Sequence, residues 1–271
     1  MIYEKEIEFA KALAREAGEI MHGHFRATGS TWKDDNTPLT VADTMINRLV
    51  IDRVKAAFPD HGVIGEEEST DERGERYSWV VDPIDGTGPF VFGAPLSMFS
   101  LALVGHVDGQ PLVAVTYDPV LDDLYWAIKG AGAYVNEKKI ETGKSTILRS
   151  QFVSLLGGKG IPGGVHLSFG SARERFSESG ARVVSLFAHV YPASRVASGE
   201  LATAILGYGS PWDAAAVALL VTEAGGVASD MDGQQRRYDE FANGVVLSAN
   251  RAIHDEVLHI IQETAREDPR D

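Results

Sequence analysis

The stretch that most constrains the fold is residues 79–87, Trp-Val-Val-Asp-Pro-Ile-Asp-Gly-Thr, in which an apolar run stops on two carboxylates, a glycine and a hydroxyl. Residues 79–81 are aromatic and β-branched, which indicates a buried strand. Because Pro83 has no N–H for a sheet ladder, we expect the strand to end there. Asp82 and Asp85 would then lie at the carboxyl end of a strand, where open α/β sheets bind their ligands.

Two further element ends carry acids. Glu66 follows the short apolar run 63–65, and Asp213 begins an apolar helix over residues 213–224. An acid near a turn can simply cap a helix, but three such ends together favour one carboxylate cluster. A cluster of this kind repels itself at neutral pH unless its pKa values rise or it holds cations. Because the chain has no cysteine and its oxygen ligands suit hard ions, the cluster predicts Mg²⁺ or Mn²⁺.

The charge balance limits the classes of partner. Asp and Glu outnumber Lys and Arg by 39 to 25, which gives a net charge of −14 and argues against nucleic acid or an anionic membrane as partner. The absence of cysteine excludes disulfides, thiolate zinc sites and cysteine nucleophiles. The polar start and the lack of a membrane-length apolar run lead us to expect a cytoplasmic protein.

Hydrophobic periodicity predicts a mixed fold. Apolar spacing of three and four indicates helices over residues 2–26 and from Thr40 or Asp43 to Phe58. Four strands separated by turns then form an expected antiparallel meander, at residues 97–107, 112–117, 124–128 and 133–135. The second half changes style and alternates strands with helices. Its expected strands are 152–156, 182–186 and 245–247, and its expected helices are 213–224 and 253–261.

We expect a soft boundary near residues 138–151. It divides the chain into an N-terminal α+β half, 1–143, with the metal-binding loops, and a C-terminal α/β half, 144–271, with the elements that recognise substrate. No linker of low complexity separates them. The halves should therefore pack as one unit, with the acidic cluster between them.

With these residues in place, the chain resembles the inositol monophosphatase family, within the lithium-sensitive, magnesium-dependent phosphatase superfamily that also holds fructose-1,6-bisphosphatases. Residues 79–87, preceded by Gly65-Glu66-Glu67, are similar to the family's first signature. Residues 212–216 running to 222–226 are similar to its second, and residues 33–43 to a third piece. The resemblance spans nearly the whole chain. It implies an α/β (α+β) fold in a layered α-β-α-β-α sandwich, a homodimer, lithium inhibition, and hydrolysis of a small phosphate monoester.

The resemblance also implies two or three Mg²⁺ ions, with Mn²⁺ as an alternative. Glu66, Asp82 and the carbonyl of Ile84 would bind the first ion, and Asp82, Asp85 and Asp213 the second, so that Asp82 bridges. A third, weaker ion would depend on Glu66 and water.

The remaining roles that the resemblance implies are those of acid–base and phosphate-binding groups. Thr87 and Glu66 would orient and deprotonate the attacking water, and Asp43 would polarise Thr87. The N–H groups of Gly86, Thr87 and Gly88, beside Asp85, would bind the phosphate. Lys33 takes the position of the family's mobile-loop lysine. From the residues alone, Asp43 is a helix N-cap and Lys33 a solvated surface lysine.

The chain departs from the family in two places. Gly88-Pro89-Phe90 follows Thr87, where the family has Thr-Asn-Phe. The segment 186–189, Leu-Phe-Ala-His, replaces a Gly-Ser-Ala-like one, and Leu206 takes the position of the carboxylate that binds inositol hydroxyls. Loss of such a charged acceptor costs about 1.5–3 kcal/mol. We therefore expect a leaving group other than plain inositol, contacted by His189 and Arg195.

Three alternatives stay open. The substrate can be fructose-1,6-bisphosphate, histidinol phosphate, adenosine 3',5'-bisphosphate or a specialised-metabolite sugar phosphate rather than inositol phosphate. A phospho-aspartate enzyme of the haloacid-dehalogenase type also contains Asp-Gly-Thr, but its acids are two apart, whereas Asp82 and Asp85 are three apart. A regulatory binding protein of the same fold is the third alternative.

Overall fold

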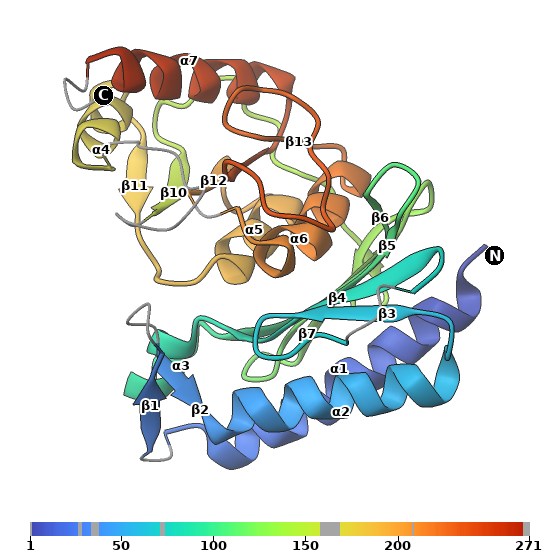
Figure 1. Cartoon of the computed structure of the whole chain (residues 1–271). Helices are drawn as coiled ribbons and strands as arrows, with labels where there is room; N and C mark the ends of the chain where they lie inside the picture. Colours follow the sequence, from blue (N-terminus) through green and yellow to red (C-terminus); the bar gives the residue numbers. More distant parts are fainter. Residues whose placement is uncertain are drawn as a thin grey trace.

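Five layers of secondary structure stack in the order helices, sheet, helices, sheet, helices (Figure 1). The computed structural model describes residues 2–26, 29–33, 38–70, 74–157, 169–207 and 209–267. Two outer helix pairs and one central pair enclose a seven-stranded and a five-stranded sheet. The layered sandwich expected from the sequence is thereby confirmed.

The seven-stranded sheet is built by the N-terminal part of the chain. Its strands follow in spatial order as β3 (Gly62–Gly65), β4 (Tyr77–Asp85), β5 (Met98–Gly105), β6 (Gln110–Asp118), β7 (Asp123–Ile128), β8 (Gly132–Val135) and β9 (Lys138–Lys139). Only β3 and β4 run parallel, and all later neighbours are antiparallel, which confirms the predicted meander. The outer face is covered by α1 (Glu4–His24) and α2 (Val41–Ala57), whose apolar sides pack on Trp79 and Phe99.

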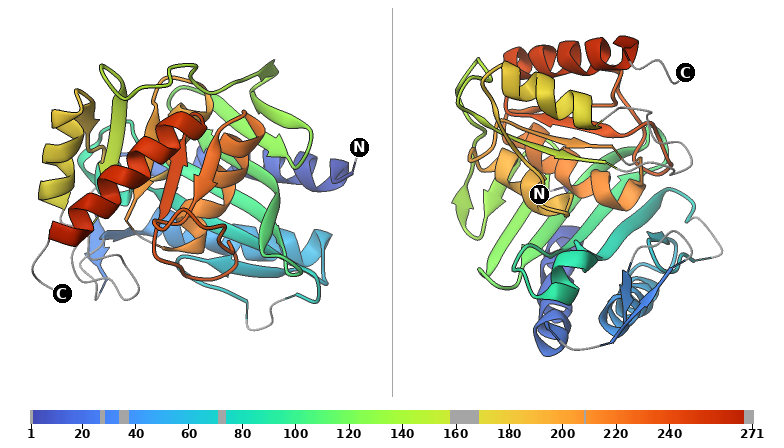
Figure 2. Two further views of the ribbon diagram at one scale, coloured as in Figure 1. Left: turned by 90° about the horizontal axis from the view of Figure 1, so that it is seen from above. Right: turned by 90° about the vertical axis from the view of Figure 1, so that its left-hand side faces the viewer.

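The five-stranded sheet belongs to the C-terminal part. Its order is β11 (Arg182–Val184), β10 (Phe152–Leu156), β12 (Thr203–Leu206), β14 (Val245–Ser248) and β13 (Val227–Ser229). The outer helices α4 (Phe169–Glu178) and α7 (Arg251–Glu267) cover one face, as both views of Figure 2 show. Three of these elements, α4, β12 and β13, were not predicted, because each is short.

The central layer consists of α5 (Val190–Ala197) and α6 (Pro211–Glu223), which lie between the two sheets (Figures 1 and 2). Residues 214–221 of α6 are all buried. A helix with a sheet on either side buries its whole circumference, which explains why this sequence is apolar all round. The first turn of α6 points its one acid, Asp213, into the same interior.

Two small elements complete the described chain. The strands β1 (Ser30–Trp32) and β2 (Pro38–Thr40) pair antiparallel ahead of α2, and the short helix α3 (Thr87–Phe92) follows β4. All strands of the seven-stranded sheet precede residue 140, and all strands of the five-stranded sheet follow residue 151. The division into residues 1–143 and 144–271 agrees with this arrangement but stays a prediction. None of the helices in the described ranges is long and apolar enough to cross a bilayer.

Candidate active site

The strand β4 carries the first two acids at its end. It continues through Pro83 to Asp85, so the expectation that it ends at Pro83 is wrong. Its pairing with β5 shifts register between Asp82 and Asp85, and an irregularity of this kind tolerates a residue without an N–H. Asp82 and Asp85 are each 2% exposed. Both carboxyl groups are therefore buried near the end of β4 rather than placed on an open loop.

The turn after β4 requires glycine. Gly86 has φ 77°, in the left-handed region, and a Cβ there would lie 3.0 Å from the Cβ of Ala188. The Gly86 carbonyl accepts a hydrogen bond from the Ser97 hydroxyl at 2.8 Å, which holds the turn. The turn leads directly into α3. Because Gly86 has no side chain, Ala188, which lies just before α5, can approach the turn that we predict to bind phosphate.

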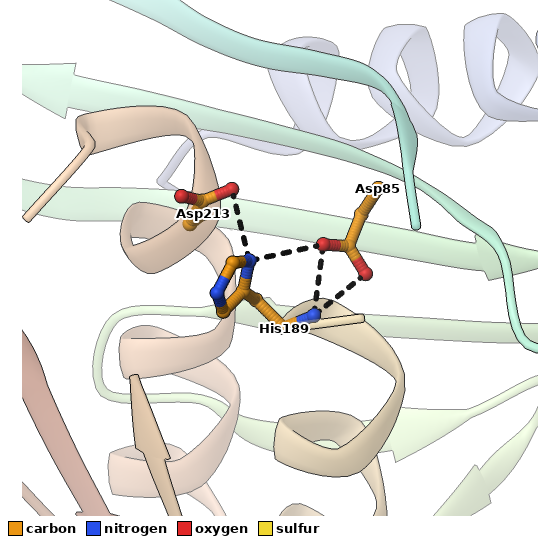
Figure 3. A group of neighbouring side chains, drawn as sticks. All are labelled: Asp85, His189 and Asp213. Atoms are coloured by element: carbon orange, nitrogen blue, oxygen red, sulfur yellow. Dashed lines mark hydrogen bonds and ion pairs between the residues drawn. The ribbon is translucent and has the colours of Figure 1, made fainter. Parts of the chain in front are cut away.

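The second carboxylate of β4 meets two groups from the C-terminal part of the chain (Figure 3). The His189 N–H donates to both oxygens of Asp85, at 2.9 and 3.1 Å, and the Val190 N–H donates to Oδ2 at 2.8 Å. The imidazole Nδ1 of His189 lies 3.6 Å from Asp85 Oδ1 and 3.6 Å from Asp213 Oδ1. Burial alone lowers the pKa of His189, but Asp213 and Asp85 raise it to about 10. The ring thus sits as a positive group between two acids.

Asp82 is buried beside four other acids. Its Oδ1 accepts a hydrogen bond from the Ile84 N–H at 3.0 Å. Burial raises the pKa of Asp82 well above its usual range, and neighbouring acids raise it further. Those acids are Glu66, Asp85, Asp213 and Asp43. Asp82 therefore marks the point at which the predicted cluster converges.

Glu66, from the loop after β3, is matched by a lysine. The Lys33 ammonium lies 2.8 Å from Glu66 Oε1 and 2.5 Å from Glu67 Oε1. Burial raises the pKa of Glu66 to about 7, with Lys33 opposing the rise and Asp213 adding to it. Burial lowers the pKa of Lys33, yet its two partners outweigh that effect and raise it above its usual range. Lys33 is paired rather than a solvated surface lysine, and Glu67, left out of the predicted set, is its second partner.

The Thr87 hydroxyl is held by the Asp43 carboxylate and by the main chain. The Thr87 hydroxyl lies 3.0 Å from the Ile84 carbonyl and 3.4 Å from Asp43 Oδ1, both of which accept. Asp43 is not the N-cap of α2, because Thr40 takes that place and its N–H donates to Asp43 Oδ2 at 2.8 Å. Asp43 is the third residue of the resulting capping box, and burial is the main cause of its raised pKa. The Asp43 carboxylate therefore completes the capping box of α2 and also contacts Thr87.

Leu206 and Arg195, both predicted to contact the substrate, have apolar neighbours and an acidic pair as their respective partners in the structure. Leu206 ends β12 with 1% exposure, inside the core cluster that also holds Val190 and Val245. Its burial does not support a role as a wall of the site. The Arg195 guanidinium lies 3.6 Å from Asp118 on β6 and 3.6 Å from Asp123 on β7.

The donor set fits a divalent cation. Asp85, His189 and Asp213 offer ligand atoms that all lie within 4.8 Å of one another. Asp82 and the part-buried Glu66 add carboxyl groups whose pKa values are raised chiefly by burial and further by neighbouring acids. A bound cation balances the negative charge of these acids, and a phosphate group can bind to the same cation. The site can thus bring cations, phosphate and the Thr87 hydroxyl together.

Comparison with known proteins agrees with this geometry. The sequence model described as "Inositol monophosphatase family" matches residues 3–266. A histidinol-phosphatase from Chlorobaculum parvum is 34% identical, over 92% of this chain and 93% of its own length. A fructose-1,6-bisphosphatase/inositol-1-monophosphatase from Thermotoga maritima is 29% identical, over 96% and 97%. The solved structure of a Thermotoga maritima IMPase superposes with a TM-score of 0.85 at 28% identity and covers 97% of this chain and 99% of its own. The chain therefore belongs to the inositol monophosphatase family.

Proposed function

We propose that this protein hydrolyses a small phosphate monoester with the help of Mg²⁺. The observation that supports this most is the burial of Asp82 among Glu66, Asp85 and Asp213 at the end of β4, directly before the Gly86 turn. In this proposal Glu66, Asp82 and the Ile84 carbonyl hold one ion, and Asp82, Asp85 and Asp213 hold a second. A third ion beside Glu66, and Mn²⁺ in place of Mg²⁺, are extensions of the same proposal.

The cations, when bound, supply neutralisation of the phosphoryl charge and a lowered pKa for water. The chain's own groups do the rest. Glu66, a carboxylate at the proposed first ion, receives the proton of the attacking water. The Thr87 hydroxyl orients that water and is itself held by Asp43 and the Ile84 carbonyl. The N–H groups of Gly86, Thr87 and Gly88 donate to the phosphate oxygens. Lys33 adds positive charge beside Glu66.

The substrate proposal extends to the alcohol. The names of the relatives point to inositol monophosphate, fructose-1,6-bisphosphate and histidinol phosphate as candidates, to which we add adenosine 3',5'-bisphosphate and other sugar phosphates. Family membership also supports a homodimer and lithium inhibition as proposals. A chain without cysteine suits a reducing compartment such as the cytoplasm.

The decisive experiment is a panel assay on the purified protein. Phosphate release from each ester is measured with Mg²⁺, with excess EDTA, and after Mg²⁺ is restored. We expect release from at least one ester with Mg²⁺, loss in EDTA and recovery on restoration. Equal release in excess EDTA, or no release from any ester with either Mg²⁺ or Mn²⁺, would contradict the proposal.

A further inference from the structure

The imidazole of His189 lies where two of the proposed metal-binding carboxylates converge (Figure 3). Its Nδ1 is 3.6 Å from one oxygen of Asp85 and 3.6 Å from one oxygen of Asp213. Adjacent ligands of one octahedral ion with bonds near 2.1 Å are about 3.0 Å apart, and opposite ligands about 4.2 Å. The observed separations fall between these values. Because the three ligand atoms all lie within 4.8 Å of one another, modest shifts of these side chains would let one ion contact all three.

The main chain holds this ring in place. The His189 and Val190 N–H groups both donate to Asp85, so the residue that carries the imidazole is tied to the carboxylate that it faces. Ala188, the preceding residue, lies against Gly86. The side chain of His189 is only 14% exposed. A ligand fixed by its own backbone and packing needs little reorganisation when a cation binds.

The chemistry of the ring alters which cation such a site prefers. Mg²⁺ binds oxygen ligands and keeps several waters, whereas imidazole nitrogen is a favourable ligand for transition ions. The ligand set implied by the family resemblance consists of oxygens alone. A nitrogen in the first coordination shell would shift preference away from Mg²⁺ and toward Mn²⁺, Co²⁺ or Zn²⁺.

We propose that His189, after its ring releases a proton to solvent, is a nitrogen ligand of the cation held by Asp85 and Asp213, and that it shifts this site's preference from Mg²⁺ toward Mn²⁺. The inference rests on the proposed function for the presence of a cation at these acids, and it adds a ligand that the oxygen-only set lacks.

The test uses Mn²⁺ itself as the probe. Loss of the free Mn²⁺ signal in electron paramagnetic resonance gives the number and affinity of bound ions. Pulsed measurements on the bound ion then detect nitrogen nuclei in direct contact with it. We expect a directly bound ¹⁴N in the unaltered protein, replaced by a ¹⁵N pattern when histidine alone is ¹⁵N-labelled. Because this readout needs no substitution, it does not depend on any variant folding.

Substitution then assigns the nitrogen to one residue. His189→Ala should abolish the nitrogen signal and weaken Mn²⁺ binding at least about 10-fold. Loss of a residue that only hydrogen-bonds to a metal ligand already costs about that much affinity. Mg²⁺ affinity, measured by calorimetry, should fall much less. The matched control is His259→Ala, because His259 lies on α7 with its side chain 68% exposed. This control should keep both the nitrogen signal and the Mn²⁺ affinity.

The outcomes separate this inference from the proposed function. Bound Mn²⁺ without nitrogen coupling, or no Mn²⁺ bound at all, overturns the role of His189. If Mn²⁺ binds without nitrogen coupling, the imidazole only pairs with the carboxylates of Asp85 and Asp213. Phosphate release with Mg²⁺ but no nitrogen coupling leaves the proposed function standing and removes only the inference. Nitrogen coupling without hydrolysis of any ester supports the metal site and counts against the phosphatase.

Discussion

A Glu66→Gln substitution tests whether the fold holds its acidic cluster against electrostatic repulsion. Burial and Asp213 raise the pKa of Glu66 from 4.5 to about 7, despite the nearby Lys33. The folded protein therefore binds this proton more tightly than the unfolded chain. The stability that comes from a raised pKa is complete below pH 4.5 and is lost as the pH rises through 7. Glutamine has the shape of the neutral acid and cannot ionise, so the variant should not lose this stability.

The size of the effect follows from the two pKa values. A shift from 4.5 to about 7 corresponds to about 3 kcal/mol, since one unit is about 1.4 kcal/mol. Part of that loss has already occurred at pH 5, so about 2–3 kcal/mol remains between pH 5 and pH 8. For a chain of this size about 1 kcal/mol moves the melting temperature by about 2–4 °C. Relative to wild type, Glu66→Gln should thus gain about 5–10 °C between pH 5 and pH 8.

The assay is thermal and urea unfolding in excess EDTA at pH 5, 6, 7 and 8. Added Mg²⁺ should stabilise wild type at pH 8 more than it stabilises Glu66→Gln, because the variant keeps the proposed ion of Asp82, Asp85 and Asp213 but loses a ligand of the other ion. The matched control is Glu68→Gln in the same loop, because Glu68 is half-exposed and pairs with Arg48 at 2.7 Å. It should keep the pH dependence of the wild type. Parallel curves for wild type and Glu66→Gln over this range would refute the reasoning.

Three further predictions concern the bridging acid, lithium and a histidine remote from the site. Asp82→Asn should keep the hydrogen bond from the Ile84 N–H but reduce kcat at least about 100-fold, because an amide cannot balance two cations; near-normal turnover would show that the cluster is misplaced. Millimolar lithium should inhibit phosphate release without competing with substrate, and full activity in its presence would count against the Asp82, Asp85 and Asp213 ion. His254 is fully buried between the Ser229 and Ser248 hydroxyls, and burial lowers its pKa to about 4. As the pH falls, His254 takes up a proton in the unfolded chain before it does so in the folded protein. The free energy of unfolding should therefore fall by about 3 kcal/mol between pH 6.5 and pH 4. In urea titrations, His254→Gln should reduce this dependence of stability on pH.

Elements with strong local patterns could be predicted from the sequence. The spacing of apolar residues in α1 and the turns between β5 and β8 predicted their place closely. The end of β4 was wrong, because pairing with β5 accommodates Pro83 in a register shift that no local rule predicts. Elements such as α5 and β12 were too short to be recognised from the sequence, and they lie in the core with α6.

The sequence by itself determined which acids end which elements, and from them the family and the layered fold. It could not determine which side chains meet. Asp85 contacts His189 across 104 positions, and Lys33 contacts Glu66 across 33. Leu206, placed by sequence count at the substrate, lies in the core cluster with α6, and its contact with substrate stays a prediction. The physical reason is range: backbone propensity and periodicity act over a few neighbouring residues, whereas the packing of two sheets on α5 and α6 decides which distant groups share one buried site.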